Sequence, residues 1–462
     1  MEQRIERLLK WLKKSDEFYL SPNVGVIESE GSGRGVVLKN GNLRKHDVIV
    51  SVPSHYQLNY YTILWNISLF NSELKIDGVT VNENEKEKYS KMLQDDDPRF
   101  QIYSSLDQTF LLSLTSFQIF EIYIMVEWIL LPLWSEGRSE SFWQRFFDVW
   151  PSEEELSSIP AIWSCSPSSK DKNLLPFLPS ASCVLLEKKI KLIDHDWALI
   201  HPWLASCVEK FCQQGQKTLP QDELYQKFLQ VYFIINSRCL YSKVLLRKGD
   251  EESQFTMVPF VDFLNHTEEI NEHCYPKVGR TPKAQTNMGP FSLKCGERGY
   301  NRIGDEILLN YGPHSNDFLL NEYGFVLERN QWNYIDISED IQAMLEGNSA
   351  MISFLKHHDY WGDYTINHSE ISYRVIVVFS LFVTKDYKRM DKFLSGFISE
   401  DYFWPKIEDT LRQFLTSLCD KIRDRVEKLE DMRAESYDFS AQNVVALYMG
   451  YMDIIEHHLD RL

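Results

Sequence analysis

The spacing of apolar residues along the chain changes several times, and each change predicts a different kind of structure. Residues 5–14 repeat apolar positions at helical spacing, whereas residues 23–53 alternate short apolar runs with Gly and Asn-Gly. The first pattern predicts an amphipathic helix and the second predicts strands, with a hairpin turn at Asn40-Gly41. From about 62 to 235 the periodicity is helical and rich in Trp and Phe, which predicts a helical segment.

The second half of the chain repeats this succession. Strand-like runs occupy about 255–328, and residues after about 338 are helical. From Lys406 to Leu429, apolar residues recur at helical spacing, which predicts a helix with one face packed in a core. A helical segment therefore interrupts a β-rich domain. The sequence predicts an α+β fold with a first domain at 1–335, its helical insertion at about 62–235, and an all-helical domain at 336–462.

The longest apolar run, from Phe110 to Trp134, is long enough to span a bilayer. It contains Glu121 and Glu127, and each carboxylate would be costly in hydrocarbon. We therefore interpret the run as a buried helix and expect no membrane association.

Composition and charge exclude some classes of protein. Of the 462 residues, 44% are hydrophobic and 13% are aromatic, which is ample for packed cores and argues against disorder. The formal net charge of −18 argues against a direct nucleic-acid partner, because neutralising phosphates requires a basic face. The same charge suits a basic protein substrate, although it can also serve solubility alone.

The cysteines give no sign of a disulfide framework or a zinc site. All 8 lack CxxC pairing and zinc-ligand spacing, and the N-terminal residues do not resemble a signal peptide. Reduced thiols and residence in the nucleus or cytoplasm are therefore expected.

The first candidate site lies in residues 258–270, VPFVDFLNHTEEI. The pattern predicts a buried strand that ends at Asp262 and is followed by Asn265 and His266 side by side. Asn265 also begins a glycosylation sequon, but nothing else in the chain indicates secretion. Asp262, His266 and His273 could instead form a partial metal site or cap turns.

A second candidate is the glycine-rich segment EGSGRG, Glu30 to Gly35. A dinucleotide-binding loop needs a helix after the glycines, whereas VVLKNGN predicts a strand and a turn. We interpret the segment as a turn between strands, which either brings backbone close to a ligand or is purely structural.

A third candidate is GDEILLNYGPHSNDFLLNEYGFV, residues 304–326. The pattern predicts a strand that ends at Tyr311-Gly312, then a polar turn, a short helix and a second Tyr-Gly at Tyr323. A structural tyrosine would explain Tyr311 alone but not the whole pattern.

In this order, EGSGRG, NSRCL, DFLNH and LLNYGPHSNDFLLNEYGF resemble the SET-domain protein-lysine methyltransferases. The resemblance is greatest to the Rubisco large-subunit methyltransferase branch and, within it, to the fungal ribosomal-protein lysine methyltransferases. It implies a knotted, β-rich SET domain with a helical insertion and a helical substrate-binding domain. It also implies S-adenosyl-L-methionine as cofactor and no metal.

The resemblance further implies roles for single residues, with Tyr311 as the catalytic tyrosine. Those implied in cofactor binding are Glu30, Gly31, Ser32, Arg238, Asn265, His266 and Tyr311. Those implied at the substrate lysine are Arg238, Asp262, Tyr275 and Tyr323. No role is implied for the insertion Lys294–Arg302.

The charge and the resemblance together imply a basic substrate, a ribosomal protein or a translation factor, and a monomeric enzyme. Histone or transcription-factor tails are equally basic and stay open as targets. Two alternatives come from other classes. One is an inactive SET scaffold that binds partners, and the other is a metal-dependent oxygenase using Asp262, His266 and His273.

Overall fold

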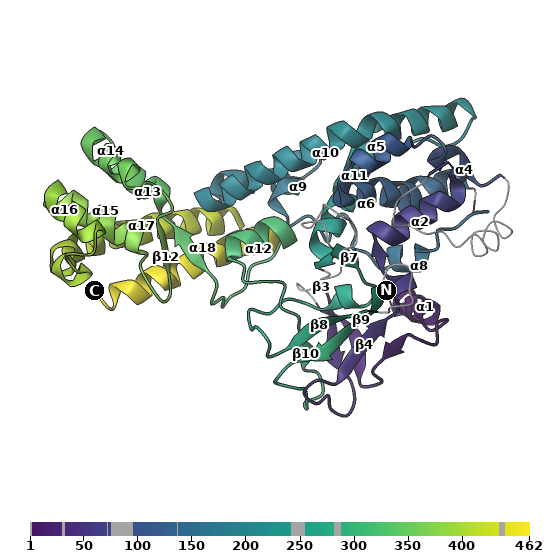
Figure 1. The fold of residues 1–462 in the computed structure, drawn as a ribbon, viewed down its shortest axis with the longest axis horizontal. Helices are drawn as coiled ribbons and strands as arrows, with labels where there is room; N and C mark the ends of the chain where they lie inside the picture. The colour runs from purple at the N-terminus through teal and green to yellow at the C-terminus, as the bar shows by residue number, and fades with distance from the viewer. Residues whose placement is uncertain are drawn as a thin grey trace. The chain divides into compact units, whose positions relative to one another are not determined.

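The computed structural model divides into two compact units, each described by itself. It describes residues 2–29, 33–71, 73–74, 96–135, 137–241, 255–280, 288–433 and 439–462. The first unit comprises residues 1–156 and 191–312, and the second comprises 157–190 and 313–462 (Figure 1). Residues 157–190 of the predicted helical insertion thus belong to the second unit. The functional boundary predicted between residues 335 and 336 stays a prediction.

The described strands of the first unit form three small antiparallel sheets. Their orders are β1-β4-β9-β8, β10-β3-β2 and β5-β7-β6. The bounds are β1 Tyr19–Leu20, β2 Val24–Ser29, β3 Gly33–Leu38, β4 Val48–Val52, β5 Leu58–Asn59, β6 Leu240–Tyr241, β7 Phe255–Met257, β8 Cys274–Arg280, β9 Met288–Cys295 and β10 Glu306–Ile307.

Helices fill the segment between β5 and β6, which confirms the helical character predicted for the described part of 62–235. Because β5 and β6 both pair with β7, the chain leaves this sheet and returns to it after the insertion. The helices of the first unit are α1 Glu2–Leu12, α2 Tyr60–Phe70, α4 Pro98–Tyr103, α5 Gln108–Ser113, α6 Ser116–Ile124, a π-helical segment Met125–Leu130, α7 Leu131–Trp134, α8 Gln144–Phe147, the C-terminal part of α10 Ser180–Gln213, and α11 Gln221–Arg238.

The strands predicted on both sides of the glycine-rich segment are present, because β2 pairs with β3 up to Ser29 opposite Gly33. The predicted turn itself falls on residues 30–32, outside the described residues. The hairpin predicted at Asn40-Gly41 is wrong. A turn is present, with Gly41 at φ +58°, but β3 pairs with β2 and β10, whereas β4 pairs with β1 and β9. A strand has only two hydrogen-bonding edges, so β3 has none left for β4.

The strand predicted to end at Asp262 is also wrong, since β7 ends at Met257. Pro259 has no N–H to donate to a neighbouring strand, and Phe260 adopts φ +74°. Val261–Phe263 then form a 3-10 helix, so Asp262 lies in a helical turn and not at a strand end.

The buried-helix interpretation is confirmed from Ser116 onward, whereas the start of the apolar run, through Ser113, belongs to the separate helix α5. Helix α6, the π-helical segment and α7 are continuous, and 72% of the most apolar window is buried inside the fold. Glu127 is 2% exposed and accepts hydrogen bonds from the Tyr103 hydroxyl at 2.8 Å and from Arg99 at 3.4 Å. Glu121 is fully buried, and its carboxyl oxygens have no hydrogen-bond partner among the described residues.

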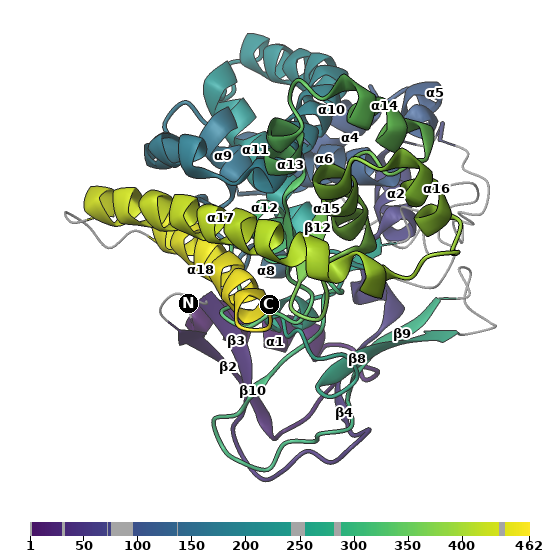
Figure 2. The ribbon, with the colours of Figure 1, turned by 90° about the vertical axis from the view of Figure 1, so that its left-hand side faces the viewer.

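The second unit is mainly helical. Its elements are α9 Pro160–Cys165, a 3-10 helix Lys170–Phe177, the N-terminal part of α10, α12 Asn316–Tyr323, β11 Tyr334–Asp336, α13 Ser338–Met344, α14 Ser349–His357, β12 Thr365–Asn367, α15 Tyr373–Thr384, α16 Tyr387–Leu394, a 3-10 helix Glu400–Tyr402, α17 Trp404–Arg433 and α18 Phe439–Leu459. Helices α17 and α18 lie side by side (Figure 2).

The apolar face predicted in α17 is confirmed, since Ile407, Leu411, Leu415, Leu418, Ile422 and Leu429 are buried and Val426 is half-buried.

Glu121 makes stability depend on pH. Burial raises the pKa of this carboxyl well above its ordinary value of 4.5, and the nearby Asp196 carboxylate adds to the effect. The folded chain therefore keeps a proton that the unfolded chain releases, so stability declines as pH rises above the ordinary value. We expect the melting temperature of Glu121→Gln to fall less than that of the parent between about pH 5 and about pH 9.

Thermal unfolding at a series of pH values measures this difference. The exposed residue Glu223, on α11, supplies the control Glu223→Gln, which should follow the parent curve. Parallel curves for the parent and Glu121→Gln would contradict the assignment of a protonated buried carboxyl.

Candidate active site

Two segments far apart in the sequence run side by side in the first unit, and they carry three of the predicted site residues. The Leu309 N–H donates to the Asn265 carbonyl at 2.9 Å, and the Thr267 N–H donates to the Leu309 carbonyl at 3.2 Å. Leu309 also forms a parallel bridge with His266. This pairing brings Asn265 and His266 beside Tyr311, as the sequence predicted.

Tyr311 is held at both ends. Its backbone N–H donates to Nδ1 of His266 at 3.0 Å, and its hydroxyl donates to the Leu264 carbonyl at 2.6 Å. The two rings lie 4.9 Å apart. Because Nδ1 of His266 accepts a hydrogen bond, its ring hydrogen is on Nε2, which fixes the tautomer and orientation of the imidazole.

The hydroxyl of Tyr311 stays protonated at neutral pH. Burial raises its pKa to about 12, and the Asp262 and Glu306 carboxylates add to this while the charge of Arg238 opposes it. A tyrosine with this pKa acts through its neutral hydroxyl and does not serve as a base near pH 7.

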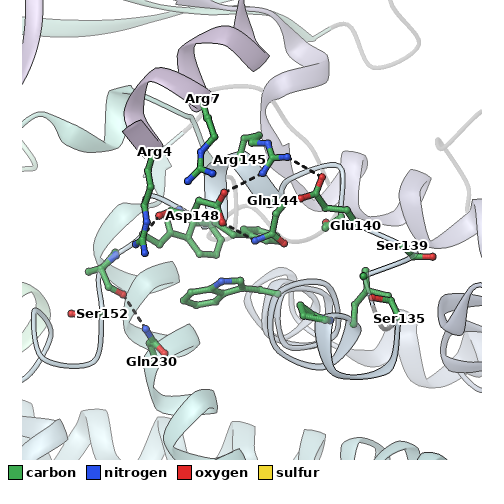
Figure 3. A pocket seen from close by; sticks show the side chains of 18 residues that line it. Arg4, Arg7, Ser135, Ser139, Glu140, Gln144, Arg145, Asp148, Ser152 and Gln230 are labelled. Atoms are coloured by element: carbon green, nitrogen blue, oxygen red, sulfur yellow. Dashed lines mark hydrogen bonds and ion pairs between the residues drawn. The ribbon is translucent and has the colours of Figure 1, made fainter. Parts of the chain in front are cut away.

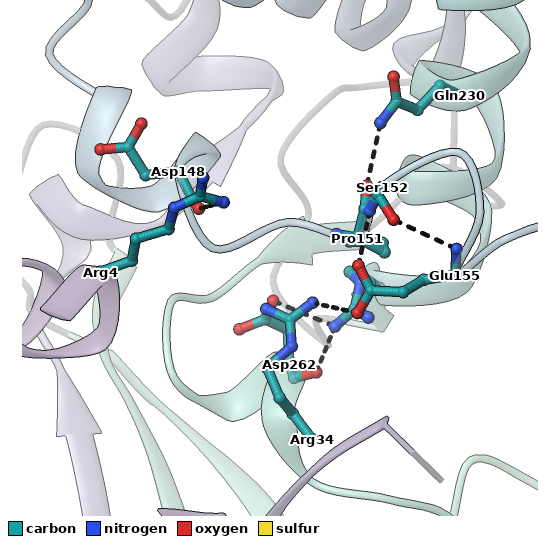
Figure 4. A network of polar contacts seen from close by, with 9 residues as sticks. Arg4, Arg34, Asp148, Pro151, Ser152, Glu155, Gln230 and Asp262 are labelled. Carbon is teal, nitrogen blue, oxygen red and sulfur yellow. Dashed lines mark hydrogen bonds and ion pairs between the residues drawn. The ribbon is translucent and has the colours of Figure 1, made fainter. Parts of the chain in front are cut away.

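Two arginines and a buried carboxylate lie close to this pair of segments. Arg238, the last residue of α11, donates to the Asp262 carbonyl at 2.7 Å and lies 3.4 Å from its Oδ2. Burial raises the pKa of Asp262, and the charges of Arg238 and Arg34 oppose that rise. Arg34, on β3, contacts Glu155 Oε1 at 3.4 Å (Figure 4). It also lies 5.6 Å from the centroid of the Phe263 ring.

The Asn265 side chain is oriented by the Glu306 carboxylate, which lies next to Gly35. Its Nδ2 donates to Glu306 Oε1 at 2.7 Å. A Cβ atom on Gly35 would lie 2.4 Å from that oxygen and 3.2 Å from Asn265 Nδ2, so a side chain at this position would have to displace the Glu306 carboxylate. The sequence reasoning missed Arg34, Gly35 and Glu306 as site residues, although all three stand inside the quoted motifs.

The described contacts of Tyr275 do not include a residue of this cluster. Tyr275, on β8, places its hydroxyl 3.2 Å from His46 Nδ1 in an exposed setting. Tyr323 ends α12 in the second unit. Glu30, Gly31 and Ser32 lie outside the described residues, and all of these roles stay predictions.

The metal-site alternative finds little support. His273 lies 2.8 Å from the Tyr300 hydroxyl and 2.9 Å from Glu269 Oε2, while Asp262 faces Arg238. The part of the chain that the structure describes contains no group of three His, Cys, Asp or Glu side chains that could hold a metal. Tyr300 comes from the insertion Lys294–Arg302, so part of this insertion supports the loop after His266.

Known proteins resemble this chain over its full length. A family model described as the ribosomal lysine N-methyltransferase 2 C-terminal domain matches residues 333–461. The ribosomal lysine N-methyltransferase 2 of Saccharomyces cerevisiae is 45% identical over 477 residues, covering 100% of both chains. The chain belongs to the ribosomal lysine N-methyltransferase 2 family.

A more distant relative and two solved structures are also similar to this chain. The ribosomal lysine N-methyltransferase set11 of Schizosaccharomyces pombe is 24% identical, covering 95% of this chain and 93% of that protein. A Rubisco LSMT structure bound to sinefungin and monomethyllysine has a TM-score of 0.55 at 13% identity, covering 99% of this chain and 91% of that one. The SET domain of LSMT bound to lysine and AdoHcy has a TM-score of 0.52 at 14% identity, covering 100% and 91%.

The predicted α+β SET fold is therefore confirmed, together with the predicted enzyme class. The protein is a protein-lysine N-methyltransferase, and its cofactor is S-adenosyl-L-methionine. The site residues fit this cofactor. Arg238 Nε and Asp262 Oδ1 are buried without a hydrogen-bond partner among the described residues. A guanidinium and a carboxylate suit the carboxylate and the ammonium of an amino-acid group.

Gly35 offers a test of the cofactor site. In Gly35→Ala the new methyl group would displace the Glu306 carboxylate and with it the Asn265 amide. We expect the affinity for S-adenosylmethionine to fall by about tenfold, which corresponds to about 1.4 kcal/mol.

Calorimetric titration of the folded variants measures the effect. The matched control is Gly25→Ala on β2, where the nearest atom to a new Cβ is the flexible Lys39 side chain at 3.1 Å. An affinity of Gly35→Ala equal to that of the parent would show that the Asn265–Glu306 pair does not shape the cofactor site.

Proposed function

We propose that this enzyme methylates a lysine of a ribosomal protein or a translation factor, in the nucleus or the cytoplasm. The observation that carries the proposal is the 45% identity to a ribosomal lysine N-methyltransferase 2 across both full chains. Charge supports it, because a chain of net charge −18 attracts and orients a substrate rich in Lys and Arg. Histone and transcription-factor tails share that chemistry and are the competing targets.

Under this proposal, Tyr311 is the catalytic residue. S-adenosylmethionine supplies an electrophilic methyl group on a sulfonium. The Tyr311 oxygen and the Leu264 carbonyl lie 2.6 Å apart, so both can accept weak C–H···O contacts from a polarised methyl group. His266 acts as a positioning residue, because its imidazole holds the backbone N–H of Tyr311.

We further assign the amino-acid end of the cofactor to Arg238 and Asp262. Its remaining polar contacts are assigned to Asn265, His266 and residues 30–32. The substrate lysine must attack as a neutral amine, and a site that excludes water lowers its pKa. The Tyr311 hydroxyl remains protonated, so it does not accept the proton that the amine loses. Residues after about 336 are proposed to help recruit the protein substrate, and Tyr275 and Tyr323 to line the lysine channel.

Tyr311→Phe tests the catalytic assignment. The change removes the hydroxyl while the backbone N–H bond to His266 remains, so the fold and cofactor affinity should change little. We expect the turnover number to fall by about a hundredfold or more, because the hydroxyl acts on the transition state. Stopped assays of methyl transfer and calorimetric cofactor binding measure the two effects separately.

Tyr241→Phe is the matched control, since Tyr241 on β6 is 61% exposed. In the parent enzyme, the rate of methyl transfer should not fall through ionisation of Tyr311 below about pH 11, because the pKa of this hydroxyl is raised. Turnover by Tyr311→Phe at the parent rate would make Tyr311 a structural residue.

Substrate identity is tested by labelling. The enzyme and isotopically labelled S-adenosylmethionine are incubated separately with ribosomal subunits, elongation factors and core histones, and Tyr311→Phe serves as the inactive control. We expect a labelled lysine in a ribosomal protein or factor. Label in histones alone would overturn the target, and cofactor binding without transfer to any of these proteins would favour the inactive scaffold.

A further inference from the structure

The first unit contains a pocket of about 790 Å³ that is lined by none of the candidate site residues. It lies among α1, the segment from Trp128 to Ser135, α8 and the turn that begins at Pro151 (Figure 3). This volume is within the usual range for small-molecule sites. The residues that line it have no use in the mechanism above.

Two cations at this pocket lack carboxylate partners among the described residues. Arg145 is neutralised by Glu140 at 3.2 Å and Asp148 at 3.3 Å. Arg4, in contrast, donates only to a backbone carbonyl at 3.4 Å, and Arg7 follows one turn later on the same face of α1. In a chain of net charge −18, two exposed guanidinium groups at one pocket indicate an anionic ligand, for which their fork of donors suits phosphate.

The inner wall of the pocket suits a flat ring with hydrogen-bond acceptors. Trp128 is half-buried beside Trp150, with ring centroids 5.3 Å apart, and belongs to the π-helical segment. Such segments recur at functional sites. Trp150 Nε1 and Ser135 Oγ have no hydrogen-bond partner among the described residues, although Trp150 is only 4% exposed and Ser135 only 2%.

A chain of polar contacts leads from this pocket to the active site (Figure 4). Gln230 donates to the Pro151 carbonyl at 3.0 Å, and the Ser152 N–H donates to Glu155 Oε2 at 2.8 Å. The other oxygen of Glu155 contacts Arg34 at 3.4 Å. Pro151, Ser152 and Gln230 line the pocket, so a ligand that shifts this turn also shifts Glu155 against Arg34.

We propose that this pocket binds a nucleoside phosphate and that its occupancy alters the affinity for S-adenosylmethionine through Glu155 and Arg34. The phosphates contact Arg4 and Arg7, and the base packs against Trp128 with its acceptors toward Trp150 and Ser135. The coupling rests on the cofactor site described above, whereas binding at the pocket is independent of methyl transfer.

Calorimetric titration of the full chain with adenosine diphosphate tests binding. We expect a dissociation constant below about 1 mM, weakened about tenfold or more in Arg4→Gln/Arg7→Gln and in Trp128→Leu. The matched control Lys10→Gln/Lys13→Gln removes the same charge from exposed positions of the same segment and should bind as the parent does. Undetectable binding at about 10 mM, or equal binding by the arginine double variant, would overturn the site.

Two further arms test the ligand class and the coupling. Adenosine and inorganic diphosphate should each bind more weakly than the diphosphate nucleotide, and equal binding of inorganic diphosphate would overturn the base-binding wall. The nucleotide should change the affinity for S-adenosylmethionine several-fold, and reciprocally. Glu155→Gln should keep nucleotide binding and lose this shift, whereas an unchanged shift would overturn the proposed route.

Discussion

The candidate active site depends on the backbone pairing of Leu309 with the segment around Asn265 and Thr267. That pairing places Tyr311 where its N–H reaches His266 and its hydroxyl reaches the Leu264 carbonyl. Neither segment forms a long strand, so these few hydrogen bonds align the two segments with each other. Methyl transfer from a sulfonium is an in-line displacement, in which alignment and removal of water supply most of the catalysis. If Tyr311 acts as proposed, the pairing serves catalysis as well as structure.

Positively charged side chains lie close to this pairing, even though the net charge of the chain is negative. The enzyme is strongly acidic, yet Arg34 and Arg238 converge on Asp262, whose side chain is fully buried. Burying arginine is costly unless its donors are satisfied, and Glu155, Asp262 and the Phe263 ring provide that compensation in part. Among the described residues, Arg34 Nη1, Arg238 Nε and Asp262 Oδ1 remain buried without a hydrogen-bond partner, and the last two suit the charged end of the cofactor.

The helical insertion shows how a small β-domain carries extra surface without losing its sheets. The chain leaves at β5 and returns at β6, and both strands pair with β7, so the ends of the insertion are fixed to one sheet. Within it, Glu127 accepts hydrogen bonds from Tyr103 and Arg99, whereas burial raises the pKa of the unpartnered Glu121 carboxyl above its ordinary value. The insertion also supplies Trp128 and the turn at Pro151, which line the pocket beside α1, and its Glu155 contacts Arg34.

The sequence alone determined the α+β class, the helical periodicity of the insertion and of α17, the buried helix before Trp134, and the motifs that hold Asn265, His266 and Tyr311. These features follow from local patterns, since burial repeats at the period of the helix and short motifs keep their chemistry together. The tertiary structure decided which strands pair, so the Asn40-Gly41 hairpin and the strand ending at Asp262 were both wrong. It also decided that Gly35, Arg34 and Glu306 belong to the site and that the Tyr275 hydroxyl faces His46. Periodicity shows which side of an element is buried, but a strand's partner and a side chain's distant hydrogen bond depend on segments that the local pattern does not contain.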